Sequence, residues 1–89
     1  MLVLPLIAEF FGTFLLVMSV FATGNALIIG LTLALNIWLL GGISGGQVNP
    51  AVSAAMLLKG AISMTEFVSY TIVQMAGAVA AYYAYITLA

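Results

Sequence analysis

Asn49 and Pro50 stand near the end of residues 41–53, the one long polar and glycine-rich run in the chain. Asparagine is a strong helix N-cap, and proline suits the first helical position because its missing N–H needs no partner there. The pair therefore predicts that a helix begins at Asn49. The Asn49 side chain also carries an N–H2 group that can donate a hydrogen bond to a neutral molecule. On spacing alone, this donor role and the helix-capping role are supported equally.

Residues 45–48 supply the complementary acceptors. We expect extended backbone here, which presents its carbonyl groups as a ladder beside the donor of Asn49. Such an arrangement suits a single file of water or small polyols, because these molecules need hydrogen bonds that replace their lost hydration. The positive end of the helix dipole raises the energy of a cation or excess proton at the same place. The four residues are Gly45, Gly46, Gln47 and Val48.

The composition places this run in a membrane. Of 89 residues, 66% are hydrophobic and 3% are charged, and the mean hydropathy is +1.37. A soluble domain carries more charge, so we expect an integral membrane protein. The chain has neither cysteine nor histidine, which argues against disulfides, thiol chemistry and imidazole metal sites, and no metal or cofactor is expected. One lysine forms no basic patch for nucleic acid, and no nucleophile–base or acid–base pair indicates an enzyme or a catalytic residue.

Helices must position the polar run, and hydropathy predicts three of them that cross the membrane. Residues 41–59 between the second and the third predict a re-entrant loop followed by a half-helix, because eleven residues from Asn49 rise only ~16 Å in a ~30 Å hydrocarbon core. The expected fold is an all-α membrane protein with three transmembrane helices plus one re-entrant loop and half-helix, in a single unit over residues 1–89. The three spans are expected at about residues 4–22, 26–40 and 64–88.

Residues with special backbone or capping roles mark where these helices end. Gly24 suits a left-handed exit from the first span, and Asn25 suits the cap of the second. Gly60 suits the C-terminal cap of the half-helix. Ser63 and Glu66 have the spacing of a capping box, which predicts the start of the third span.

Small and aromatic residues indicate how the spans pack and where the membrane surface lies. Small residues four apart let helix backbones approach closely. Tyrosines near the end of the last span fit an aromatic belt at the membrane surface. The small pairs are Ala8 and Gly12, Gly30 and Ala34, and Gly77 and Ala81, and the tyrosines are Tyr82, Tyr83 and Tyr85.

Three polar side chains lie inside the predicted spans. Glu9 is a carboxylate within the first span, and an ionisable group at that depth is a functional hypothesis by default. It would suit the proton-coupling site of a secondary transporter built from broken helices. Gln74 lies in the third span, and Asn36 in the second is expected to bond across a helix interface.

Three stretches resemble motifs of the aquaporins and glycerol facilitators, the major intrinsic protein family. Residues 44–52, Ser-Gly-Gly-Gln-Val-Asn-Pro-Ala-Val, resemble the family's first signature loop. Residues 8–13, Ala-Glu-Phe-Phe-Gly-Thr, resemble its first-helix motif, and residues 74–78, Gln-Met-Ala-Gly-Ala, its third-helix motif. The motifs occur in the family's order and cover nearly the whole chain, so the resemblance is specific.

The resemblance implies a passive channel for water or small neutral solutes such as glycerol. It favours the donor role of Asn49, and it implies that Glu9 and Gln74 support the loop rather than contact solute. Ile29, 20 residues before Asn49, would face the outer constriction, where the family often has a bulky aromatic residue. The implied pore-lining residues are Ile29, Gly45, Gly46, Gln47, Val48, Asn49, Pro50, Ala51 and Val52.

The chain also departs from the family pattern. A family channel has six spans and two such loops, so this chain resembles its N-terminal half and is expected to conduct only when paired with a second half. Gln47 stands where many members have histidine. Val52 stands at the position that carries the filter arginine after the second loop, and this chain contains no arginine. Two copies paired head to tail would therefore have a wide, apolar filter.

Three sources of the second half stay open: another copy inserted in the opposite orientation, a different chain, or the rest of a six-span protein of which this is a fragment. Lys59 is the only cation, and the positive-inside tendency places the N-terminus in the cytoplasm. Because the bias rests on one lysine, dual topology is compatible with it. Membrane lipids and the solute itself are the other expected partners. The alternative functions are a transporter subunit that uses Glu9 and a non-conducting membrane assembly subunit.

Overall fold

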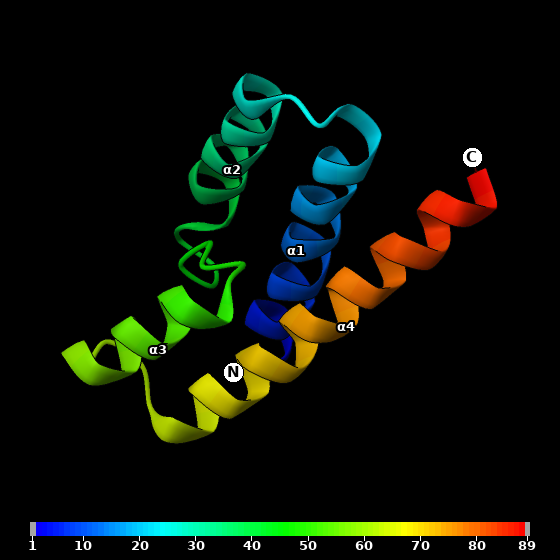
Figure 1. The fold of residues 1–89 in the computed structure, drawn as a ribbon. Helices are drawn as coiled ribbons and strands as arrows, with labels where there is room; N and C mark the ends of the chain where they lie inside the picture. The colour runs from blue at the N-terminus through cyan, green and yellow to red at the C-terminus, as the bar shows by residue number, and fades with distance from the viewer. Residues whose placement is uncertain (1, 89) are drawn as a thin grey trace.

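The computed structural model describes residues 2–88, and these residues form four helices and no strand. Met1 and Ala89, the first and last residues of the expected unit 1–89, lie outside the described residues. Figure 1 shows the helices in chain order. They are α1 (Val3–Thr23), α2 (Ala26–Leu40), α3 (Pro50–Lys59) and α4 (Met64–Leu88).

Two of the helices are long and apolar enough to cross a membrane. These are α1 with 21 residues and α4 with 25. The helix α2 is apolar but has 15 residues, which rise only ~22 Å. The helix α3 has 10 residues and rises ~15 Å. The all-α expectation is therefore confirmed, with two helices of spanning length.

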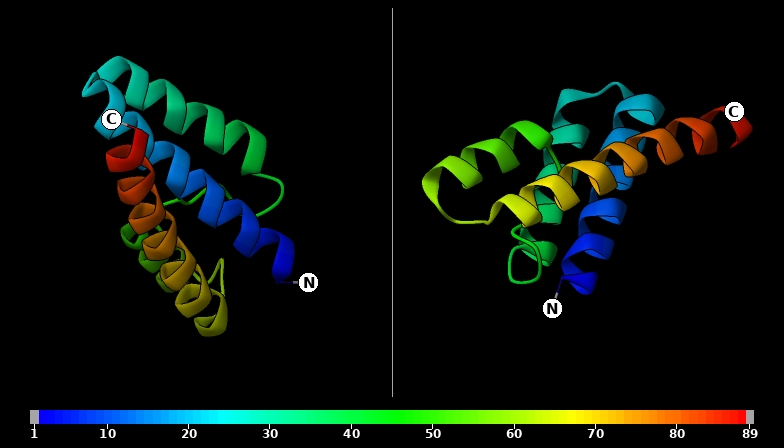
Figure 2. Two further views of the ribbon diagram at one scale, coloured as in Figure 1. Left: turned by 90° about the vertical axis from the view of Figure 1, so that its right-hand side faces the viewer. Right: turned by 90° about the horizontal axis from the view of Figure 1, so that it is seen from below.

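The helix α1 is the centre of the arrangement. It contacts α2 and α4, while α3 contacts α4. Figure 1 shows α2 returning beside α1 in the opposite direction, and both views of Figure 2 show α4 crossing α1. Residues 41–49, which we call the loop, connect the end of α2 to α3. The connection between α1 and α2 and the end of α4 lie at the opposite end of the molecule from the connection between α3 and α4 (Figure 1).

The predicted helix ends are confirmed. Gly24 adopts a left-handed φ of 55° after α1, and the Asn25 side chain accepts a hydrogen bond from the N–H of Ile28 at 3.0 Å. Gly60 closes α3 with a φ of 83°. Ser63 and Glu66 bond each other reciprocally before α4: the Ser63 N–H donates to the Glu66 carboxylate at 2.9 Å, and the Glu66 N–H donates to the Ser63 hydroxyl at 3.1 Å.

Small residues let α4 pack directly against the backbone of α1. A Cβ atom on Gly77 would overlap the backbone carbonyl oxygen of Phe10, so only glycine fits there. A Cβ atom on Gly12 would lie 2.7 Å from the side chains of Leu40 and Val48. Gly30 differs, because no atom of the described residues lies within 4 Å of its Cβ position. The close approach expected at the α2 pair therefore does not occur within residues 2–88, since that face of α2 has no neighbour there.

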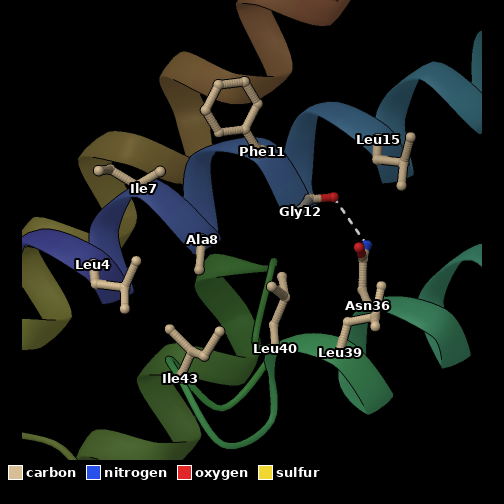
Figure 3. A pocket seen from close by; sticks show the side chains of 10 residues that line it. All are labelled: Leu4, Ile7, Ala8, Phe11, Gly12, Leu15, Asn36, Leu39, Leu40 and Ile43. Atoms are coloured by element: carbon tan, nitrogen blue, oxygen red, sulfur yellow. Dashed lines mark hydrogen bonds between the residues drawn. The ribbon is translucent and has the colours of Figure 1, made fainter.

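Asn36 joins α2 to α1, as expected from the sequence. Its side-chain N–H2 donates to the Gly12 carbonyl oxygen at 2.9 Å, across an apolar groove of about 330 Å³. Figure 3 shows this hydrogen bond and the side chains around the groove. All of the lining residues other than Asn36 are apolar, so the groove offers a hydrated solute no free donor. The lining residues are Leu4, Ile7, Ala8, Phe11, Gly12, Leu15, Asn36, Leu39, Leu40 and Ile43.

Candidate functional site

The loop is tightly turned, which differs from the extended backbone expected at residues 45–48. Gly45, Gly46 and Val48 have left-handed φ values of 94°, 59° and 44°. A Cβ atom on Gly46 would lie 2.9 Å from the Cα of Ile37, so the loop passes directly over α2. Val48 is β-branched, and such residues rarely adopt a positive φ. The surroundings of the loop must therefore hold this conformation.

Glu9 is the main anchor of the loop. It is 0% exposed, and four neutral groups donate to its carboxylate. Oε2 accepts from the Ser44 hydroxyl at 2.6 Å and from the Gln47 N–H at 3.0 Å. Oε1 accepts from the Val48 N–H at 2.7 Å and from the Gln74 side-chain N–H2 at 2.8 Å. Both oxygens are saturated with donors, as a buried carboxylate requires.

Gln74 ties α4 to both α1 and α3. Besides Glu9, its side-chain nitrogen donates to the Ser53 hydroxyl at 3.0 Å. The Ser53 hydroxyl in turn donates to the Gln47 side-chain oxygen at 2.6 Å. Gln74 is 1% exposed and Ser53 is 0% exposed, so this chain of bonds is shielded from solvent. It fixes the first turn of α3 to the end of the loop.

Asn49 caps α3 and keeps its donor free. Its side-chain oxygen accepts from the Ala51 N–H at 2.8 Å, and Pro50 occupies the first turn of the helix. The Asn49 side chain is exposed, and its N–H2 group forms no hydrogen bond within residues 2–88. One side chain therefore stabilises the helix start and still presents a donor to a molecule at that point.

The predicted pore-lining residues differ in exposure and in position. Gln47 and Val48 are buried, so their side chains face the protein and only their backbone is left for a solute. Ile29 lies in the first turn of α2, at the other end of that helix from the loop, so the described residues do not bring it beside Asn49. The residues exposed around the start of α3 are Gly45, Asn49, Ala51 and Val52, with Pro50 half-buried and Gly46 buried.

Ser44, Ser53 and Tyr70 also belong to the hydrogen-bond network, and the sequence reasoning did not select them. The Tyr70 hydroxyl donates to the Ser44 backbone carbonyl oxygen at 3.0 Å. Tyr70 precedes Gln74 by four residues, so the two share one face of α4. That spacing was a usable signal, since a buried tyrosine hydroxyl needs a partner. No comparable pattern marks Ser44 or Ser53.

The network contains a single ionisable carboxylate, Glu9. Residues 2–88 contain no cluster of three or more histidine, cysteine, aspartate or glutamate residues that could hold a metal ion. The site's chemistry is therefore that of hydrogen bonds and of one helix N-terminus, which carries partial positive charge. It can hold and orient a neutral hydrogen-bonding molecule.

The chain is similar in sequence to known proteins of one family. The family model described as major intrinsic protein matches residues 22–88. The chain is 44% identical over 84 residues to "Glycerol uptake facilitator protein-like 6" of Lactiplantibacillus plantarum, a match that covers 84% of this chain and 39% of the relative. It is 37% identical over 89 residues to "Aquaporin Z" of Brucella melitensis, covering 83% of this chain and 39% of the relative.

A third relative is "Aquaglyceroporin AqpS" of Rhizobium meliloti, which is 33% identical over 90 residues, with 83% of this chain and 39% of the relative covered. No solved structure matches the chain. The chain thus spans about two fifths of the length of these relatives. Both the family model and the relatives lead to the same conclusion: the chain belongs to the major intrinsic protein family.

Proposed function

We propose that this chain is one half of a passive membrane channel for water or small neutral solutes such as glycerol. Members of the family are membrane channels and not enzymes. The observation that carries the proposal is the start of α3, where Asn49 caps the helix and leaves its side-chain N–H2 free. The names of the relatives, which include a glycerol facilitator and an aquaporin, favour the same class of solute.

In this proposal α1, α2 and α4 cross the membrane, and the loop with α3 re-enters it. The helix α2 is short for a span, but residues 41–44 continue it by a turn, in which the N–H groups of Ile43 and Ser44 donate to the Leu40 carbonyl at 2.9 Å. The backbone of α3 then begins near the membrane midplane with its positive end toward the solute. A passing water molecule or polyol accepts from Asn49, while a cation is repelled by the helix end.

A second half is needed to close the pore. Asn49, Ala51 and Val52 are exposed in this chain, so one wall of the proposed path is uncovered within residues 2–88. The relatives are longer, which fits a pore made from two such units. The second unit is another copy in the opposite orientation, a different chain, or a further part of the same protein. Lys59 near the end of α3 favours a cytoplasmic N-terminus, and a single lysine leaves dual topology open.

Val52 bears on selectivity. It follows Asn49-Pro50-Ala51, at the position that carries arginine after the second signature loop of the family. Its side chain is 38% exposed at the start of α3. With valine in both halves, a pore built from two copies has no charged group at this place and discriminates weakly between water and glycerol.

The burial and hydrogen bonds of Glu9 bear on the transporter alternative. A coupling carboxylate exchanges its proton with water, whereas Glu9 is 0% exposed and has four donors from the loop and α4. These contacts favour a supporting role. The third class, a non-conducting assembly subunit, predicts that no pairing of this chain conducts.

Stopped-flow light scattering on proteoliposomes tests the proposal. The chain is reconstituted alone and then with a second half taken from a relative, under a water gradient and afterwards a glycerol gradient. We expect faster volume change than in empty liposomes for at least one pairing, and loss of that change in Asn49→Asp. Permeability equal to empty liposomes in both preparations contradicts the channel. Uptake that depends on a proton gradient and is lost in Glu9→Gln supports the transporter instead.

A further inference from the structure

Tyr70 holds the start of the loop from α4. Its side chain is 3% exposed, and its hydroxyl donates to the Ser44 carbonyl oxygen at 3.0 Å. Gln74, one helical turn further on, donates to Glu9 and to Ser53. The helix α4 is therefore hydrogen-bonded to the site at two places. Tyr70 bonds the start of the loop, and Gln74 bonds Glu9 and Ser53, which hold the end of the loop.

Ser44 is fully bonded because of this contact. Its hydroxyl donates to Glu9 at 2.6 Å and accepts from the Gly46 N–H at 3.2 Å. Its own N–H donates to the Leu40 carbonyl at 2.9 Å. Tyr70 supplies the partner of the remaining group, the Ser44 carbonyl. Without the tyrosine hydroxyl, a buried carbonyl group loses its donor, which is unfavourable in an apolar environment.

The residues after Ser44 make its position important. Gly45 and Gly46 have left-handed φ values of 94° and 59°, and glycine allows more backbone conformations than any other residue. Glycine has no side chain that would restrict this backbone. Its path is held by the Gly45 N–H, which donates to the Leu40 carbonyl at 3.2 Å, by the contact of Gly46 with α2, and by the two anchored ends. Glu9 anchors the later end through the N–H groups of Gln47 and Val48. The earlier end depends on Ser44, which Glu9 and Leu40 hold by its hydroxyl and N–H groups and Tyr70 holds by its carbonyl.

We propose that Tyr70 is a positioning residue for the channel site. Its hydroxyl fixes the Ser44 carbonyl, and through it the path of residues 45–48 beside Asn49, so that Tyr70 sets how strictly the pore discriminates between neutral solutes of different size. This inference rests on the proposed channel function. Because Glu9 and Gln74 still hold the end of the loop, removal of the Tyr70 hydroxyl loosens one wall of the pore and leaves α3 in place.

Tyr70→Phe isolates the hydroxyl, since the buried ring stays. Tyr83→Phe is the matched control on the same helix: Tyr83 is 60% exposed, and its hydroxyl forms no hydrogen bond within residues 2–88. Both variants are reconstituted in a pairing that conducts, and water and glycerol permeabilities are measured on the same liposomes. We expect the glycerol-to-water ratio to rise by at least about twofold in Tyr70→Phe, the factor that corresponds to the net contribution of one hydrogen bond.

The ratio separates positioning from stability. A variant that merely folds less well lowers both permeabilities in proportion, because fewer channels are present and each keeps its selectivity. An unchanged ratio in Tyr70→Phe, or the same rise in Tyr83→Phe, overturns the proposal.

Thiol labelling tests whether Tyr70 fixes the start of the loop, and it does so without measuring conduction. The chain contains no cysteine, so Ser44→Cys, a nearly isosteric change, gives one reporter at the start of the loop. Thr13→Cys gives a second reporter, in α1, where Thr13 is 4% exposed. We expect Tyr70→Phe to accelerate labelling of the first reporter by at least about twofold and to leave the second unchanged.

Equal acceleration at both reporters indicates general unfolding and overturns the proposal, as does no change at either. The reconstituted 89-residue chain is used, and no conduction assay is needed. Failure of the proposed channel function is thereby distinguished from failure of the proposed role of Tyr70.

Discussion

Glu9 and Gln74 are 65 residues apart in the chain and are joined by a hydrogen bond of 2.8 Å in the interior. This bond links α1, the first helix, to α4, the last. Each partner also reaches the site between them: Glu9 accepts from the loop, and Gln74 donates to Ser53 in α3. The two ends of the fold are therefore connected through the residues that place Asn49.

Glu9→Gln is expected to release the loop. The substitution keeps the side chain's size but replaces one acceptor oxygen by an N–H2 group, which leaves buried donors of the loop unpaired. Each unpaired buried group costs about 1–3 kcal/mol. We expect the free energy of unfolding to fall by more than about 2 kcal/mol, measured by circular dichroism during denaturation in detergent micelles.

Glu66→Gln is the matched control for this change. Among residues 2–88, the Glu66 carboxylate accepts only the Ser63 N–H, at the start of α4 and outside the buried network. Glutamine keeps an acceptor oxygen for this N–H, as in a capping box, so the effect is expected to stay below the roughly 1 kcal/mol of a lost helix cap. Equal stability of Glu9→Gln and the unchanged protein would refute the anchoring role.

Gly77→Ala is expected to separate α1 from α4. The new methyl group would overlap the Phe10 carbonyl oxygen, which belongs to backbone and cannot rotate away. Overpacking of this kind costs about 1–3 kcal/mol. Gly30→Ala is the control, since its Cβ position is open and alanine favours helix by up to about 1 kcal/mol. Thermal unfolding of the two variants should therefore shift in opposite directions, and a stable Gly77→Ala would contradict the close packing.

Asn49→Asp separates capping from conduction. Aspartate still accepts the Ala51 N–H and caps α3, but it has no N–H2 group and carries a negative charge at the proposed solute path. We expect unchanged helix content by circular dichroism and a water permeability at least about tenfold lower, a barrier increase of about 1.4 kcal/mol.

Asn25→Asp makes the same chemical change at the cap of α2, where the side chain accepts the Ile28 N–H. Its permeability should equal that of the unchanged chain. If both variants lose permeability equally, Asn49 has no special role in conduction.

Val52→Arg is expected to make the proposed pore more selective. The larger, charged side chain narrows the path beside Asn49, so glycerol permeability should fall by at least about tenfold more than water permeability, a difference of about 1.4 kcal/mol between the two barriers. Leu58→Arg places the same residue later on α3, at a side chain that is 88% exposed. Its glycerol-to-water ratio should stay the same. A ratio that is unaffected by Val52→Arg would place Val52 outside the filter.

The sequence predicted those features of the fold that are decided within one helical turn. Gly24, Asn25, Gly60 and the Ser63–Glu66 pair act on backbone groups at most four residues away. Such contacts depend on residue type and spacing alone, and these helix ends were correct.

The hydrogen-bond partners inside the site could not be predicted in the same way. Tyr70 bonds Ser44 across 26 residues and Gln74 bonds Ser53 across 21, so these contacts depend on the path of the loop. That path was expected to be extended and is tightly turned, because the left-handed φ of Val48 follows from the surrounding bonds and not from valine's own preference. Glu9 stands out in the sequence as a carboxylate inside a predicted span. The supporting role of Glu9 and Gln74 comes from the family resemblance, which carries information about distant contacts that spacing lacks.

The burial of Glu9 also constrains how the chain is made. Ribosomes synthesise α1 before the loop and α4, so Glu9 precedes its donors, which are Ser44, Gln47, Val48 and Gln74. On insertion scales a charged side chain costs about 2.5–3.5 kcal/mol at the centre of a helix and less toward its ends. The apolar residues of α1 must offset that cost until α4 is complete. The polar core is therefore complete only when Gln74 of α4 reaches Glu9.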